Sequence, residues 1–285
     1  METTKKNNKA LVGIFAFCAC AMANNMTMAI IAYIMQSYSN VSPTVVSQLL
    51  AIPSLIGTVF AFFVGTLNTK FNVKSLMILV QAALFASGMM YFLLGGKAPI
   101  YVLYVAAGLV GLNQGSMMTL LSVMLSKLFD DPQKRSSVYG ICTAIQNIGG
   151  VFFSVVGGAL AVNGWTKAYM LYFLIIIAII FEILFLPGGE PEGAKAPAHA
   201  DAPKQNVGRM PITVYVIAIH YFFFFLWLYV YGSNVSEYII NTYKLGTSVE
   251  AGLATSLVTG GGIVAGAFFG QYSKVLKKCT VPFMM

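Results

Sequence analysis

Six amide side chains occur as three adjacent pairs, and each pair lies near the middle of a long apolar stretch. The pairs are Asn24 with Asn25, Asn113 with Gln114, and Gln146 with Asn147. An amide inside a membrane needs a partner in the protein or a water-filled cavity. Adjacent residues of a helix point about 100° apart, so at most one member of each pair can face a central cavity. The other is expected to bond a neighbouring helix.

Two titratable side chains, Glu182 and His220, also lie inside apolar stretches. A transporter driven by protons needs such a group. We expect the Glu182 carboxylate, near the end of its stretch, to reach the aqueous interface. Because imidazole titrates near neutral pH and His220 lies deeper, it is the better candidate for handling protons. The stretches contain no Lys or Arg, which argues against a dianion site and favours a neutral, zwitterionic or amphipathic solute.

The composition places these residues in a membrane protein. The chain is 58% hydrophobic and 9% charged, with a mean hydropathy of +0.78, which excludes a soluble surface. A helix needs about 20 residues to cross the hydrocarbon core. Eight stretches reach this length, and none alternates as the strands of a barrel do, so we predict an all-α, polytopic fold. They are residues 10–35, 45–67, 75–94, 100–125, 138–162, 168–186, 212–231 and 252–271.

The basic residues set the predicted orientation. With the N-terminus in the cytoplasm, the inner loops hold 14 of the 17 Lys and Arg residues, and the outer loops hold Lys97, Lys167 and Lys244. This asymmetry is the positive-inside pattern. It predicts a multi-pass protein of the plasma (inner) membrane, and it accounts for the net charge of +8 without a nucleic-acid partner. The cysteines lie in spans or on the inner side, where we expect no disulfide.

A weak internal repeat divides the chain. Residues 33–65 align without a gap with residues 238–270, 205 positions later, and both copies place a polar, Tyr-rich segment before a long apolar one. A Pro-rich segment at 188–209 separates the copies and cannot form a core. We therefore predict a six-helix half over 1–187, a cytoplasmic linker over 188–209 and a partial second half over 210–285 with two helices and the start of a ninth. Such repeats are typical of transporters.

Several motifs resemble the major facilitator superfamily, in particular its prokaryotic solute permeases. The loop after the second span keeps Gly65, Lys70 and Lys74 of the family's gating loop, but Thr69 and Asn72 replace its usual Asp and Gly. The fourth span has Ala107 where many members have Arg. The loop 129–135, followed by the segment 147–150, is very similar to that of family members. The order of these motifs along the chain carries the resemblance.

The resemblance implies where the solute pathway lies. Helices one, four and seven would line the cavity, which adds His220, Tyr229 and Asn234 to the six amides as substrate-binding candidates. Helices two, five and eight would form the seam along which the halves rock. Each carries small residues at every fourth position, a pattern that permits close helix packing in any bundle. The seam candidates are Gly57, Gly150, Gly158, Gly262, Gly266 and Gly270.

Three classes of function were weighed. The first is secondary transport of a small solute by alternating access, with a proton or another ion as a candidate coupled partner and a monomer as the intact form. The second is a non-transporting fragment, because two helices of a second half leave a cavity open on one side. The third, an intramembrane enzyme, is disfavoured because the chain has two His, lacks a His-Glu-x-x-His motif and has no Asp within a span. We expect no cofactor and no metal.

Overall fold

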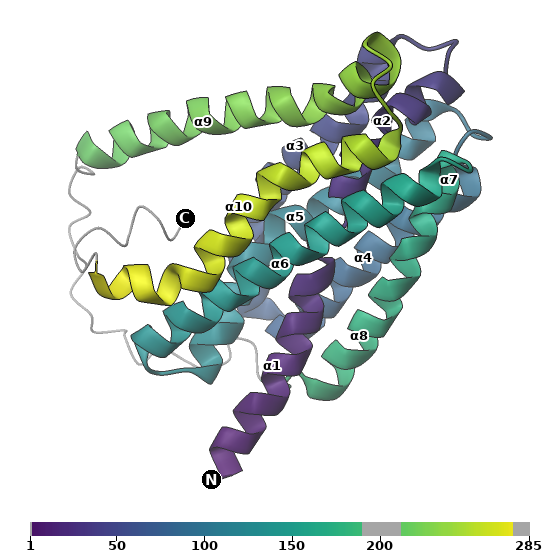
Figure 1. The fold of residues 1–285 in the computed structure, drawn as a ribbon. Coiled ribbons are helices and arrows are strands. Elements are labelled where there is room, and N and C mark those ends of the chain that lie inside the picture. The colour runs from purple at the N-terminus through teal and green to yellow at the C-terminus, as the bar shows by residue number, and fades with distance from the viewer. Residues whose placement is uncertain (1, 190–211, 276–285) are drawn as a thin grey trace.

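The computed structural model describes residues 2–189 and 212–275, which form a bundle of helices (Figure 1). The predicted linker 188–209 lies almost entirely outside these residues. The helices are α1 (Glu2–Cys20), α2 (Asn25–Ser37), α3 (Pro43–Lys70), α4 (Val73–Leu94), α5 (Ile100–Leu128), α6 (Pro132–Ala161), α7 (Trp165–Ala168), the 3₁₀ segment η1 (Tyr169–Tyr172), α8 (Phe173–Phe185), α9 (Ile212–Glu237), the π segment η3 (Tyr238–Thr242) and α10 (Ser248–Val275).

The predicted all-α membrane bundle is confirmed. In the described part of the chain, six segments are long and apolar enough to cross a membrane. They are Lys9–Ser37, Pro43–Lys70, Val73–Leu94, Ile100–Leu128, Pro132–Ala161 and Trp165–Phe185. The other two predicted spans coincide with α9 and α10. Parts of both helices lie outside the fully described residues, and neither counts among the six.

The sequence predicts continuous helical spans, but two of the spans are interrupted. The first is interrupted at residues 21–24, where the Ala23 N–H donates to the Cys20 carbonyl and the Asn25 N–H to the Met22 carbonyl, at 3.1 and 3.0 Å. Bonds of this three-residue spacing tighten the turn and redirect the chain. The sixth span begins as α7, passes through η1 and continues as α8. The two interruptions lie next to each other in space. Thr27, just after the first, and Tyr169, at the start of η1, have their hydroxyls 3.0 Å apart.

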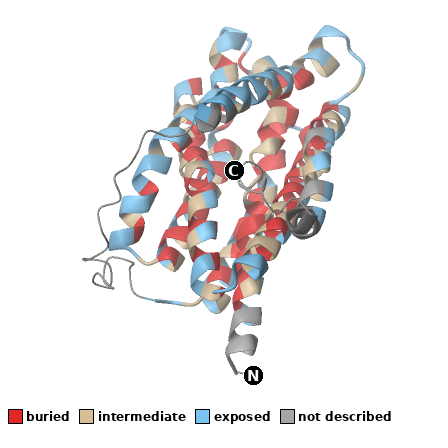
Figure 2. Ribbon diagram, turned by 90° about the vertical axis from the view of Figure 1, so that its left-hand side faces the viewer, coloured by how far each residue is buried: buried red, intermediate tan, exposed pale blue. Residues whose placement is uncertain are grey.

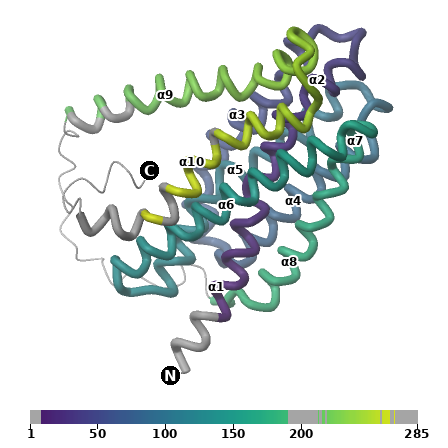
Figure 3. The backbone as a smooth tube through the Cα atoms, in the orientation of Figure 1, coloured from purple at the N-terminus to yellow at the C-terminus, as the bar shows by residue number. Residues whose placement is uncertain are grey.

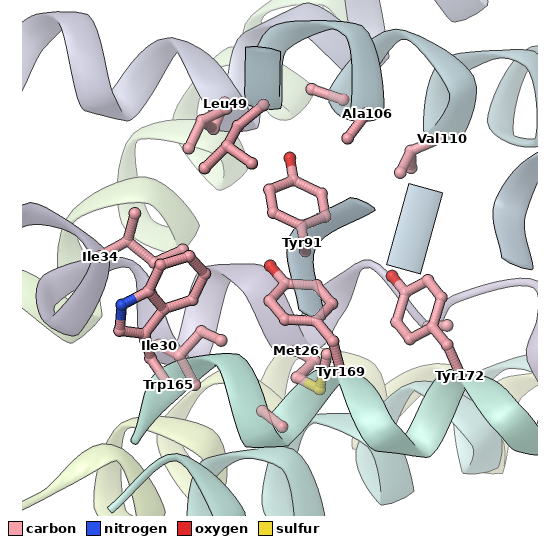
Figure 4. Close-up of a cluster of buried hydrophobic side chains, with 14 of the residues drawn as sticks. Met26, Ile30, Ile34, Leu49, Tyr91, Ala106, Val110, Trp165, Tyr169 and Tyr172 are labelled. Carbon is pink, nitrogen blue, oxygen red and sulfur yellow. The ribbon is translucent and has the colours of Figure 1, made fainter. Parts of the chain in front are cut away.

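A cluster of aromatic side chains fills the space between these broken spans (Figure 4). The rings of Tyr91 and Tyr169 stack with centroids 4.5 Å apart, and both side chains are buried. The indole of Trp165 packs edge-on against Tyr169 and donates a 2.7 Å hydrogen bond to the Ser37 hydroxyl. This bond satisfies the one polar atom of the indole. The cluster therefore fixes the C-terminal end of α2 and the short helix α7 against α4.

The two helices after the linker differ in how they pack. Helix α10 packs along α6, whereas α9 meets α10 near η3 and diverges from it toward its other end (Figures 1 and 3). Buried residues line the faces where the first-half helices meet, and exposed residues cover the outside (Figure 2). On α9 the rings of residues 222–225 are all more than half exposed. Consecutive rings point about 100° apart around a helix, so much of the surface of α9 is open to lipid or to further protein.

Candidate functional site

A cavity of about 650 Å³ lies between the first six spans and the two helices that follow the linker. Its walls come from the break between α1 and α2, from α2, α3 and α5, and from α9 and α10. The lining residues are Met22, Asn25, Met28, Ser54, Thr58, Gln114, Phe222, Phe225, Leu226, Leu228, Tyr229, Tyr231, Gly232, Thr255 and Thr259. None carries a formal charge. The size is within the range of small-molecule sites, about 300–1,000 Å³.

Three of the nine predicted substrate-binding residues line this cavity: Asn25, Gln114 and Tyr229. Within the described chain, their side-chain polar atoms make no hydrogen bond to the protein. An amide or hydroxyl at a membrane-embedded position that the protein does not satisfy depends on water or a ligand for its partners. These three groups, contributed by three different helices, are therefore free to bind a solute.

The partner amide of each pair is used inside the protein. The Asn113 amide donates to the Gln81 side chain at 3.1 Å, with both residues buried, and Asn24 accepts from the Thr27 hydroxyl at 3.1 Å. In α6 neither amide reaches the cavity. Gln146 is fully buried with its amide nitrogen 3.8 Å from the Cys18 sulfur, and Asn147 donates to the Thr143 carbonyl at 2.8 Å.

The remaining two candidates lie on α9 but do not line the cavity. His220 is exposed, with its ring edge-on to Tyr221. Asn234 is exposed and donates to the Val230 carbonyl of its own helix at 2.7 Å. The uniformly apolar character of α9 gave no periodic signal from which to choose its cavity face.

Five hydroxyl residues in the cavity wall were missed by the sequence analysis. Ser54 and Thr58 come from α3, Tyr231 from α9, and Thr255 and Thr259 from α10. Thr58, Thr255 and Thr259 each donate to a carbonyl of the same helix, which leaves the hydroxyl oxygen free to accept a hydrogen bond. The sequence does not single out these hydroxyl residues, because a Ser or Thr that donates to a carbonyl of its own helix is tolerated anywhere in a span.

One end of the cavity is bridged by polar bonds between the two repeats. The Gln36 amide donates to the Asn241 amide oxygen at 2.7 Å, and Asn241 donates to the Glu237 carboxylate at 2.7 Å. Gln36 and Asn241 are equivalent positions of the internal repeat, 205 residues apart. Nearby, the buried Ser236 hydroxyl donates to the Ala29 carbonyl at 2.9 Å. These bonds join α2 to α9 and η3.

The predicted seam glycines divide between two contacts. Gly158 and Gly262 lie at the α6–α10 contact, where Gly158 accepts a hydrogen bond from the Ser248 hydroxyl and Gly262 faces the Asn147 side chain. Two seam assignments are corrected: Gly57 packs against the α5 backbone at Gly111 and Gly115, and Gly150 faces Met22 and Asn25. The packing of Gly266 and Gly270 lies outside the described residues.

The predicted gating loop joins α3 to α4 and contacts the end of α8. The Lys74 ammonium donates to the Ile183 carbonyl at 2.7 Å, while Gly65 and Lys70 are exposed. Asn72, which replaces the family's usual Gly, accepts from the Lys74 backbone N–H at 3.0 Å as an N-cap of α4 and donates to the Gly189 carbonyl. The replacement residue therefore ties this loop to the beginning of the predicted linker.

A second cavity, of about 430 Å³, lies between α1, α6 and α8. Its lining consists of apolar side chains, Gly149 and Cys20. It lacks the polar groups that orient a polar solute, so the cavity between the repeats is the stronger candidate for the solute site.

Comparison with known proteins agrees with this architecture. The Major Facilitator Superfamily model matches residues 13–285. No curated protein shows a significant match. A similar solved structure is that of the MFS proton:xylose symporter XylE bound to 6-bromo-6-deoxy-D-glucose, with 12% sequence identity and a TM-score of 0.47. The match covers 99% of this chain and 56% of that one, so the chain spans little more than half of the symporter's length. This multi-pass membrane protein belongs to the Major Facilitator Superfamily.

Proposed function

We propose that this chain forms the solute pathway of a secondary transporter that works by alternating access and moves a small neutral or amphipathic solute. The observation that carries the proposal is the uncharged cavity between the two repeats, into which Asn25, Gln114 and Tyr229 bring unpartnered polar groups. Phe222 and Phe225 add apolar surface for the less polar part of the solute. Alternating access needs walls from both repeats, and α9 and α10 supply the second wall.

The location is part of the proposal. With the N-terminus in the cytoplasm of a plasma (inner) membrane, the end bridged by Gln36 and Asn241 faces the outside. The polar bonds between α2 and η3 then hold the outer end closed. A solute bound at Gln114 would leave toward the cytoplasm.

The test is uptake into proteoliposomes across a panel of neutral sugars, nucleosides and amino acids, with dicarboxylates as the contrasting class. Gln114→Ala and Tyr229→Phe should each raise the half-saturating concentration of the transported solute about 2- to 10-fold, the loss expected for one neutral hydrogen bond. Asn234→Ala is the matched control on α9, because its amide bonds its own helix. Saturable uptake of a dicarboxylate, or a larger effect at Asn234 than at Tyr229, would contradict the proposal.

A second candidate is a chain that does not transport by itself and contributes this pathway within a longer protein. The observation that favours it is the exposed aromatic surface of α9 away from the cavity, where Phe223 and Phe224 are 62% and 54% exposed. The same uptake assay separates the candidates. Folded protein that binds a panel solute, as seen by a rise in its thermal stability, but does not move it across the bilayer would support the second.

A further inference from the structure

The Glu182 side chain is buried within the first half, close to the amide of Gln81 but, within the described chain, with neither carboxyl oxygen in a hydrogen bond of ordinary geometry. It lies on α8, and its exposed fraction is 0%. The expectation from sequence that Glu182 reaches the aqueous interface is therefore wrong. A buried carboxyl in a tightly packed bundle is costly, so its presence requires an explanation.

Among the residues that the structure describes, the groups that face Glu182 supply no compensating positive charge. From α1, the thiols of Cys18 and Cys20 lie near enough to interact with it electrostatically. From α4, the neighbouring polar group is the amide of Gln81. The one Lys of α4 that reaches α8 is Lys74, and its ammonium is bonded to the Ile183 carbonyl. An ionised carboxylate in such surroundings would cost several kcal/mol. The carboxyl is therefore neutral in this arrangement and carries a proton.

A line of buried amides connects this carboxyl to the wall of the solute cavity. Gln81 is fully buried, donates to the Phe17 carbonyl at 3.4 Å, and accepts from the Asn113 amide at 3.1 Å. Asn113 is followed directly on α5 by Gln114, which lines the cavity. The two residues belong to one rigid helical turn, so a movement of Gln114 toward a solute also moves Asn113 and, through it, Gln81.

We propose that Glu182 is a reversible proton-binding site of this protein, connected to the solute cavity through Gln81, Asn113 and Gln114. The inference rests on the proposed transport function for its purpose, but the site itself does not depend on it. Binding converts the carboxylate to the carboxylic acid with a proton taken from water, and release returns that proton to water. Release requires a movement of α4 or α5 that admits water to the carboxyl, because the described groups that face the carboxylate in the closed packing give it no compensating positive charge.

The test is infrared spectroscopy of the full chain in lipid nanodiscs, at acidic and alkaline pH and in H₂O and D₂O. Protons and deuterons are the probe, so no solute is needed. We expect a stretching band of a buried carboxylic acid that shifts in D₂O, weakens at alkaline pH and is absent from Glu182→Gln. Glu250→Gln, which removes an exposed carboxylate from the first turn of α10, is the control and should keep the band.

Three results would overturn the proposal. They are a wild-type protein without the band, a band that persists in Glu182→Gln, and a band that responds neither to D₂O nor to pH. The first and third need only the wild-type chain, so the test holds even where Glu182→Gln fails to fold. A positive band together with no uptake of any panel solute would reject the transport function and leave the proton site standing.

Discussion

Replacing Gly252 with Ala tests whether α6 and α10 form a close-packed contact on which movement between the halves depends. A methyl group on Gly252 would lie 2.6 Å from the Ser154 carbonyl oxygen and 3.3 Å from the Val155 Cα. Ordinary van der Waals contact begins at 3.4 Å, so the backbones must separate by 3.4 − 2.6 = 0.8 Å at this point. The atom in the way belongs to the backbone of a helix, and it cannot rotate aside. Overpacking of this kind costs about 1–3 kcal/mol.

The matched control is Gly261→Ala on the same helix, where a methyl group would meet nothing within 4 Å. Both variants gain the helix propensity of Ala, so their difference isolates the contact. Hydrogen exchange of α10 peptides in nanodiscs, read by mass spectrometry, should be about 5- to 150-fold faster in Gly252→Ala than in Gly261→Ala, since about 1.4 kcal/mol corresponds to a factor of ten. Equal exchange rates in the two variants would refute the close α6–α10 contact.

Three further predictions concern the ends of the bundle. Gln36→Ala removes the bond to Asn241 and should raise the labelling rate of a cysteine introduced in the outer loops by about 2- to 10-fold, the effect of one neutral hydrogen bond. Trp165→Phe and Ser37→Ala each remove the hydrogen bond between the indole and the Ser37 hydroxyl. A double-mutant cycle in thermal unfolding should therefore give a coupling free energy of about 0.5–1.5 kcal/mol, and additive effects of the two substitutions would count against this hydrogen bond. Donation from the Thr247 hydroxyl, and to a lesser extent from its backbone N–H, lowers the pKa of Glu250 below its ordinary value of 4.5. The stabilisation that ionised Glu250 gives the first turn of α10 is therefore present above pH 4.5 and is lost as the pH falls through the lowered pKa. Exchange of this turn should lose that pH dependence in Glu250→Gln.

The sequence predicted where the helices lie but not where they break. Apolar length alone located all the long helices, because a lipid core demands about 20 residues in hydrogen-bonded helical form. The interruption at 21–24 and the 3₁₀ segment at Tyr169–Tyr172 contain no Pro that would have indicated them. Beside them the Thr27 and Tyr169 hydroxyls approach each other, a tertiary contact between the first and sixth spans. Single-sequence periodicity carries no information about such contacts.

The amide pairs show why the site could be predicted only in part. The sequence identified Asn113 and Gln114 as an either-or choice, since their side chains point about 100° apart. The choice between them depends on the position of α4, because the Gln81 side chain on α4 accepts a hydrogen bond from the Asn113 amide. On α6 neither amide lines the cavity: Asn147 donates to the Thr143 carbonyl, and Gln146 is fully buried with its nitrogen near the Cys18 sulfur and its oxygen without a partner in the part of the chain that the structure describes. A pair of polar residues thus indicates a cavity only where the packing of neighbouring helices leaves one member facing it.

The bond between Gln36 and Asn241 bears on how the two repeats are related. Under an approximate two-fold axis, a residue can touch its own equivalent only where it lies close to the axis. This contact joins equivalent positions of the repeat, 205 residues apart, so such an axis would pass near it at the end of the cavity. The neighbouring bond from Ser236 to Ala29 lies just before the aligned segments; at the same offset of 205 residues Ser236 corresponds to Ile31, which has no hydroxyl to make a mirrored bond. The symmetry would therefore govern how the helices approach, while divergence of individual side chains decides which hydrogen bonds join them. Under the proposed alternating access, these bonds break when this end opens, so Gln36 and Ser236 are the residues at which we expect substitution to ease opening without altering the cavity wall.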